Sequence, residues 1–183
     1  MRKPVILLAT VLSVVAVVPP GEARADEPAA SPAPRLEGTY APLNAKAAQA
    51  GIEAAVESVV QEMNFIKRPF ARSKLLDTNA LLSSVRFQFQ GDQLTYTYNG
   101  GHVIRLVVNG PAIRWKSPAD GEFYETKGTL AGRRFTLSFK GEDGSKQEVF
   151  ELGTDGVTLV YQAVVTSPQL PKALRFTYTL KRK

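Results

Sequence analysis

The first regular pattern along the chain is an apolar stripe with helical spacing. Intervals of four, three, four and three residues separate five apolar side chains: Ile52, Val56, Val59, Met63 and Ile66. This spacing places them on one face of an α-helix. Asn44 is a suitable N-cap before the stripe, and Pro69 is expected to end the helix because proline lacks a backbone N–H. The pattern predicts one amphipathic helix between Asn44 and Pro69.

From Ser84 to the C-terminus the period changes from 3.6 to 2. Phe87 and Phe89 alternate with polar neighbours, and turn signals such as Asn109-Gly110 recur at short intervals. Eight or nine short strands follow one another without a helical crossover, which excludes parallel pairing. We therefore expect a mainly β fold, in which an antiparallel up-and-down meander forms a closed or nearly closed barrel after the helix.

The N-terminal segment predicts export. Arg2 and Lys3 precede an apolar run of about fourteen residues, which is shorter than the ~20 needed to span a bilayer, and small residues around Ala25 fit a cleavage site. Residues 1–25 are therefore expected to be a signal peptide, and the protein to be secreted or periplasmic, with no transmembrane segment after cleavage. The Pro- and Ala-rich residues 26–40 are expected to form a flexible linker. Residues 41–183 are expected to form a single domain.

Composition narrows the possible chemistry. The chain has 183 residues, no cysteine and one histidine, which excludes disulfides, thiolate nucleophiles and multi-histidine metal cages. The net charge of +6 is spread along the sequence, so nucleic acid is not expected as a partner. No phosphate-binding glycine loop or dinucleotide fingerprint is present, and we expect no cofactor.

Catalytic groups are not evident either. His102 is the only histidine, it starts a predicted strand beside two glycines, and no nucleophile elbow accompanies it. Several carboxylates lie at turns or polar strand positions and are expected to be solvated: Glu122, Glu125, Asp143, Glu148 and Glu151. We therefore expect no catalytic residues, no metal site and no enzymatic activity.

Two short segments of the chain resemble the lipocalin and fatty-acid-binding (calycin) group. Gly38-Thr39-Tyr40 is similar to the calycin Gly-x-Trp, with Tyr40 in place of tryptophan, and the last strand ends Phe176-Thr-Tyr-Thr-Leu-Lys-Arg182. The segments 63–72 and 167–171 are also similar to uncharacterised secreted bacterial proteins. The calycin resemblance implies that a small lipophilic molecule binds inside the barrel.

Five residues are candidates for contact with such a ligand. Arg68 and Arg72 are expected at the barrel mouth, where their guanidinium groups would hold an anionic head group. The alternative is that these arginines cover helix carbonyls. Tyr96, Trp115 and Tyr161 are expected to line the pocket, or else to belong to a filled core.

Two functional hypotheses remain from the sequence. The first is an exported, monomeric, non-enzymatic binder of a small amphiphilic ligand. The second is an envelope or extracellular interaction protein with a solid barrel, whose partner is a protein or a polysaccharide. Internal volume distinguishes them, because binding requires a cavity of a few hundred Å³.

Overall fold

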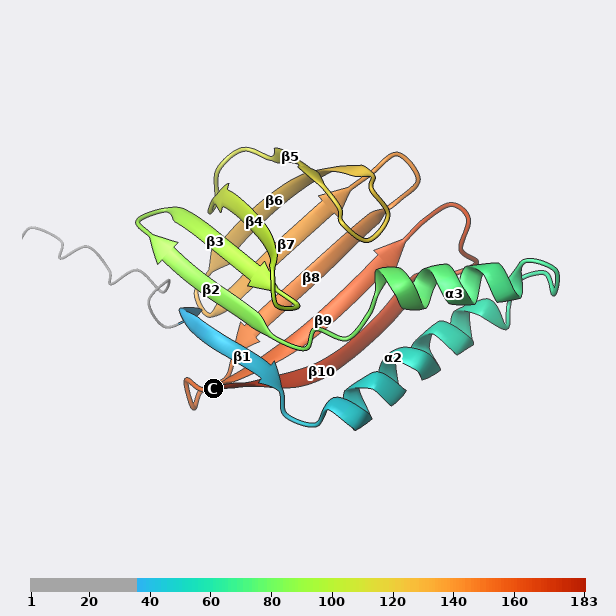
Figure 1. Cartoon of the computed structure of the whole chain (residues 1–183), viewed down its shortest axis with the longest axis horizontal. Coiled ribbons are helices and arrows are strands. Elements are labelled where there is room, and N and C mark those ends of the chain that lie inside the picture. The colour runs from blue at the N-terminus through green and yellow to red at the C-terminus, as the bar shows by residue number, and fades with distance from the viewer. Residues whose placement is uncertain (1–35) are drawn as a thin grey trace, which may run out of the picture. The chain divides into compact units, whose positions relative to one another are not determined.

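The computed structural model describes residues 36–183, which form ten antiparallel strands and two helices (Figure 1). The predicted signal peptide and the linker up to residue 35 lie outside the described residues. In the part of the chain that is described, no helix is both long enough and apolar enough to cross a bilayer.

The first strand precedes the helices. Strand β1 (Gly38–Pro42) is followed by α2 (Ala45–Val60), α3 (Arg68–Thr78) and β2 (Val85–Gln90). The expectation that the helix comes before all strands is therefore wrong, and residues 38–40 belong to the sheet instead of the linker. The alternation of apolar and polar residues did not reveal this strand, because it has five residues, of which only Tyr40 is buried.

The remaining strands follow the predicted meander, in which each strand pairs with the next except at β4 and β5, which are the two edges of the sheet. Their bounds are β3 (Gln93–Tyr98), β4 (His102–Val107), β5 (Ile113–Lys116), β6 (Phe123–Ala131), β7 (Arg134–Lys140), β8 (Ser145–Leu152), β9 (Thr158–Thr166) and β10 (Leu174–Arg182). The sheet order is β4-β3-β2-β1-β10-β9-β8-β7-β6-β5. The mainly β, antiparallel prediction is confirmed, and β1 raises the strand count from the predicted eight or nine to ten.

The barrel is nearly closed, with a seam between β4 and the β5–β6 hairpin. Asn109 joins the two sides at one end of this seam. Its backbone N–H donates to Gly128 O at 2.9 Å, its Nδ2 donates to Leu130 O at 3.2 Å, and its Oδ1 accepts from Leu130 N at 2.9 Å. The side chain thus replaces the strand-to-strand hydrogen bonds that continuous pairing would supply.

The predicted single helix is two helices. Asn44 caps α2 as expected, since its Oδ1 accepts from Ala47 N at 3.0 Å, but α2 ends at Val60. Pro69 lies in the first turn of α3, where its missing N–H costs no hydrogen bond. Pro69 therefore marks the start of a helix, and the apolar spacing across residues 60–68 was coincidental.

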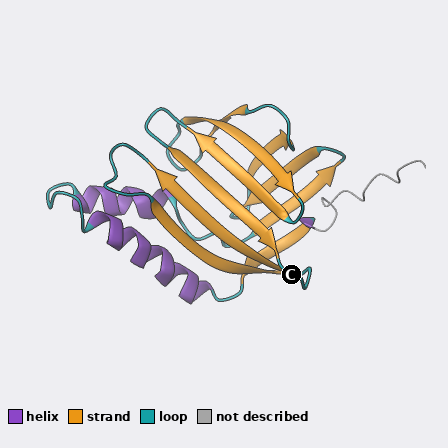
Figure 2. Cartoon of the chain, turned by 180° about the vertical axis from the view of Figure 1, so that it is seen from behind, coloured by secondary structure: helices purple, strands orange, loops and turns teal. Residues whose placement is uncertain are grey.

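The two helices pack on each other, and α2 packs along β10 (Figure 2). Val56, Val59 and Val60 of α2 form a small buried cluster with Leu75 of α3 and Leu174 of β10. By contrast, Ile66 in the connection between the helices is 65% exposed.

The barrel core is filled at the end that carries the β2–β3, β6–β7 and β8–β9 turns. Phe87 lies 5.7 Å from Phe135 and 5.2 Å from Phe150, ring centre to ring centre, in edge-on contacts. These three rings are fully buried, and such packing is as dense as in any protein interior. This end of the barrel is therefore solid.

Candidate functional site

A cavity of about 940 Å³ opens at the other end of the barrel. Because consecutive turns of a meander alternate between its two ends, this end carries the β3–β4, β5–β6, β7–β8 and β9–β10 connections together with α3. All five segments contribute to the lining. The helices and turns thus position the residues of the cavity, and the strands supply its floor.

The floor holds a buried charged group. Glu148 is 5% exposed. Its Oε1 accepts a hydrogen bond from Tyr161 Oη at 2.9 Å and forms an ion pair with Lys146 Nζ at 2.9 Å. We refer to Lys146, Glu148 and Tyr161 as the inner cluster. Burying a carboxylate is costly unless it is paired and hydrogen-bonded, and the inner cluster provides both kinds of contact.

Strand β8 explains how Glu148 comes to point inward. Its buried positions are Glu148, Phe150 and Leu152, which alternate with more exposed residues. The expectation that Glu148 is solvated is therefore wrong. The period-two pattern already placed Glu148 on the face of Phe150 and Leu152, so the signal for this residue was present in the sequence.

The hydroxyl group of Tyr96, which lines the cavity, lacks a hydrogen-bond partner. Tyr96 Oη is buried and makes no hydrogen bond with any described residue, and the same is true of Thr126 Oγ1 on β6. Buried hydroxyl groups are normally hydrogen-bonded. Tyr96 Oη is therefore a buried donor and acceptor that the described residues leave unused.

The tyrosines around Glu148 stay protonated at neutral pH. Burial, followed by the negative charge of Glu148, raises the pKa of Tyr96 and of Tyr161 well above the ordinary value. Burial, again with a smaller effect of Glu148, raises the pKa of Tyr98 to about 12. These side chains act as neutral phenols, which donate hydrogen bonds and offer aromatic faces.

Aromatic rings form much of the wall. Tyr96 stacks on Tyr98 with ring centres 5.5 Å apart, and Trp115 lies 5.5 Å from Phe139. His102 is exposed at the mouth, 5.2 Å from the Tyr98 ring. The cavity thus combines apolar rings with a few polar groups, as small-molecule sites do.

The structure places the three predicted aromatic residues at or beside the cavity. Tyr96 and Trp115 line it, and Tyr161 lies behind the lining, where it donates to Glu148. Lys146 and Glu148 were not predicted as site residues, because Glu148 was expected to be solvated and Lys146 forms its ion pair with that carboxylate.

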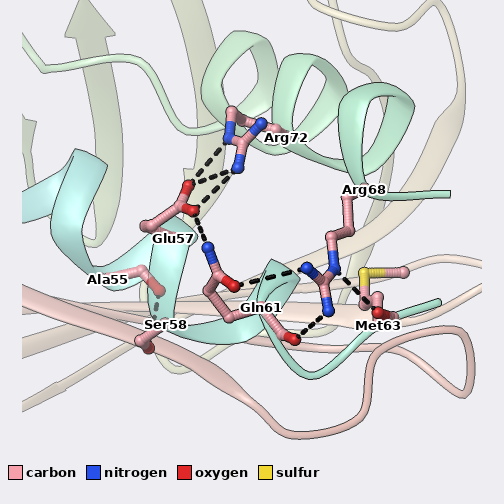
Figure 3. Close-up of polar contacts among 7 residues, drawn as sticks. All are labelled: Ala55, Glu57, Ser58, Gln61, Met63, Arg68 and Arg72. Atoms are coloured by element: carbon pink, nitrogen blue, oxygen red, sulfur yellow. Dashed lines mark hydrogen bonds and ion pairs between the residues drawn. The ribbon is translucent and has the colours of Figure 1, made fainter. Parts of the chain in front are cut away.

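The two predicted arginines lie elsewhere, between the helices (Figure 3). Arg72 forms two hydrogen bonds of 2.8 Å with the carboxylate of Glu57 in α2. Arg68 donates from Nε to Met63 O at 3.0 Å and from Nη2 to Gln61 O at 2.7 Å, just beyond the end of α2. Arg68 therefore covers helix-end carbonyls, which was the alternative interpretation, and neither arginine lines the cavity.

Among residues 36–183, no group of three or more His, Cys, Asp or Glu side chains is arranged to hold a metal ion. The inner cluster, with its lysine, its carboxylate and its phenol, is a hydrogen-bonding site instead.

Sequence comparisons find no relative, since no protein-family model and no curated protein match the chain. Solved structures do match. A fatty-acid-binding protein from the brain of Drosophila melanogaster superposes with a TM-score of 0.50 at 17% identity, covering 80% of this chain and 98% of the other. The fluorescent protein UnaG superposes with a TM-score of 0.51 at 12% identity, covering 82% of this chain and 99% of the other.

These matches span nearly the whole length of the other proteins, and the identities are low, so they show the fold alone. They agree with the nearly closed ten-stranded barrel and its helix pair between β1 and β2. In fold, the chain therefore resembles the fatty-acid-binding proteins and related calycin-like β-barrels.

Proposed function

We propose that this protein is a non-enzymatic carrier that binds one small lipophilic or amphiphilic molecule inside its barrel. The cavity of about 940 Å³ is the observation that carries the proposal. Pockets for small molecules typically measure ~300–1,000 Å³ and combine apolar walls with a few polar groups. The aromatic wall and the inner cluster supply both, and a fatty-acid-binding protein is among the structures that share this fold.

We further propose that the carrier works outside the cytoplasm. The support is the N-terminal pattern of Arg2, Lys3, the apolar run and the small residues around Ala25. Determining the N-terminal sequence of protein recovered from its own host tests this, with Asp26 expected as the first residue. Recovery of protein that starts at Met1 would contradict it.

A second candidate function rests on a different feature. Phe65, Ile66 and Phe70 are 75%, 65% and 79% exposed at the junction of α2 and α3. Exposed apolar side chains that gather in one place mark contact surfaces. This favours an extracellular or envelope interaction protein, with or without a ligand in its cavity.

Native mass spectrometry separates the two candidates. Protein purified gently from its host is weighed before and after extraction with organic solvent. The carrier proposal predicts an excess mass that the solvent removes, and the excess identifies the ligand class. A bare polypeptide mass, together with no thermal stabilisation by added fatty acids, amines or sterols, would favour the interaction protein.

A further inference from the structure

We propose that the ligand carries a cationic head group, a protonated amine or a quaternary ammonium, which binds against Glu148 and the aromatic wall. This inference rests on the proposed carrier function and names the ligand class. It follows from three features of the cavity: the sign of its charge, the free side of Glu148 and the arrangement of its rings.

The cavity is acidic although the protein is basic. Six carboxylates line it: Asp77, Asp120, Glu122, Glu142, Asp143 and Glu148. Three permanently basic side chains line it: Lys74, Arg114 and Lys146. The whole chain has a net charge of +6, so the negative excess is particular to this cavity. Walls that carry one sign of charge concentrate ligands of the opposite sign.

Several of the lining carboxylates lie at the mouth of the cavity. Partial burial raises the pKa of Asp120, but hydrogen bonds from Tyr124 Oη at 2.7 Å and from Ser117 outweigh burial and hold it below its ordinary value. Glu142 and Asp143 are exposed on the β7–β8 turn. A cation entering the cavity therefore passes fixed negative charges.

The inner cluster leaves one side of Glu148 for a ligand. The hydrogen bond from Tyr161 and the ion pair from Lys146 both involve Oε1. Among residues 36–183, no hydrogen bond is found to Oε2. Lys146 and Glu148 balance each other's charge, so the preference for a cation over an anion comes from the other carboxylates of the lining. Oε2 of Glu148 then offers an ammonium group an acceptor that is already held in position.

The rings provide a second kind of contact for a cation. Ammonium groups are attracted to the faces of aromatic rings within about 6 Å of the ring centre, and tryptophan and tyrosine are the best partners. Tyr96, Tyr98, Trp115 and Phe139 all line the same cavity as Glu148. Tyr96 Oη adds an acceptor for an ammonium N–H, since it has no partner among the described residues.

Three amphiphiles with one chain length test the proposal: dodecylamine and dodecanoate below their critical micelle concentrations, and dodecanol below its solubility limit. Their affinities for the solvent-extracted protein are measured by calorimetry at low ionic strength. We expect dodecylamine to bind about tenfold more tightly than dodecanoate, with dodecanol between them. Dodecanoate or dodecanol binding as tightly as the amine, or more tightly, would overturn the cationic head group and leave the carrier function standing.

If none of the three amphiphiles binds, and native mass spectrometry finds no extractable mass, then both the head group and the carrier function are wrong. The two failures are therefore distinguishable.

Glu148→Gln tests whether the head group binds at Glu148. We expect it to weaken dodecylamine binding by about tenfold and to change dodecanol binding by no more than about twofold. Glu151→Gln is the matched control, because Glu151 lies on the same strand with its carboxylate paired to Arg134 outside the barrel. An equal loss for amine and alcohol would mean that Glu148 is only structural, and no loss would mean that it does not hold the head group.

A variant at the mouth of the cavity tests the role of negative charge without changing any residue of the barrel floor. Glu142→Gln combined with Asp143→Asn removes two exposed charges from the β7–β8 turn without touching the core. We expect slower association and about two- to threefold weaker binding of dodecylamine, with the difference disappearing at high salt. Unchanged amine binding at low salt would contradict the role assigned to the acidic mouth.

Discussion

Tyr96 and Tyr161 are equally buried tyrosines of one barrel interior, but their hydroxyl groups differ. Tyr161 Oη donates to Glu148 at 2.9 Å, whereas Tyr96 Oη has no partner among the described residues. A buried hydroxyl without a partner lowers stability, while one that serves a buried carboxylate raises it. The same residue type therefore has an unpartnered hydroxyl group at one position and a structural hydroxyl group at the other.

The Tyr→Phe substitution at each position measures this difference. In solvent-extracted protein, Tyr96→Phe is expected to raise the free energy of unfolding by up to about 1 kcal/mol, and Tyr161→Phe to lower it by about 1–3 kcal/mol. Urea unfolding of the two variants gives both values. Equal effects of the two substitutions would show that the hydroxyls are in similar surroundings.

Arg72 was expected to bind an anionic head group because its side chain is a guanidinium, but its position in the fold does not allow this. Its guanidinium is paired with Glu57, and both side chains are about 40% exposed, at 39% and 41%. The hydrogen bond from Arg72, with help from Gln61, lowers the pKa of the Glu57 carboxyl from its ordinary value of 4.5. The pair joins α2 to α3 and is unavailable for an anionic head group.

The pH dependence of Arg72→Ala follows from that lowered pKa. A carboxyl whose pKa falls on folding stabilises the protein above its unfolded value, and this contribution is lost as the pH falls through the folded value. We therefore expect a small loss of melting temperature at pH 7 that shrinks as the pH falls below 4.5. A difference in melting temperature that is constant across this range would exclude the ion pair as its cause.

At the scale of elements, strands were easier to predict than helices. Alternation in the strands from β2 to β10 survives in the structure because each strand buries one face against the same interior. The helix stripe was misleading, since apolar side chains after Val60 continue its spacing without being buried. Because Pro69 was expected to end the helix, no helix was predicted at α3, which Pro69 in fact begins.

Two isoleucines of the predicted stripe show where the helix really ends. Ile52 is 1% exposed and Ile66 is 65% exposed. We expect Ile52→Ala to cost about 2–5 kcal/mol of unfolding free energy and Ile66→Ala to change it by no more than about 0.5 kcal/mol. Chemical denaturation of both variants checks the pair, and a large loss for Ile66→Ala would restore the single long helix.

At the scale of the whole molecule, the sequence predicted a barrel but not how it closes or where it is hollow. Closure depends partly on β1, whose five residues show little alternation of apolar and polar side chains. It also depends on Asn109, whose hydrogen bonds at the seam are to a residue about twenty positions later in the sequence. The cavity arises because the two ends of the meander differ in side-chain size and polarity. Those are properties of packing, which periodicity alone does not encode.

Gly128 makes closure at the seam possible. A Cβ there would lie 2.7 Å from Leu106 Cδ1 and 3.1 Å from a ring carbon of Phe135, so its absence lets Leu106 of β4 reach the β6 side. We expect Gly128→Ala to destabilise the protein by about 1–3 kcal/mol.

Gly51→Ala is the matched control for Gly128→Ala, because a Cβ at Gly51 meets nothing within 4 Å and lies in α2. Alanine there is expected to stabilise the helix by about 0.5–1 kcal/mol. Thermal unfolding of the two variants should shift in opposite directions, and a neutral Gly128→Ala would mean that the seam is not tightly packed.

The pairing of β1 with β10 determines when this barrel can form during synthesis. Tyr40 lies opposite Arg182, which donates to its hydroxyl at 2.7 Å, and Lys183 N donates to Thr39 O at 2.9 Å. These contacts join β1 to the end of β10, 142 positions later along the sequence. Until β10 has left the exit tunnel of the ribosome, β1 has only β2 to pair with, and the sheet retains an extra open edge. The barrel therefore depends on a strand pairing of high sequence separation, which slows folding.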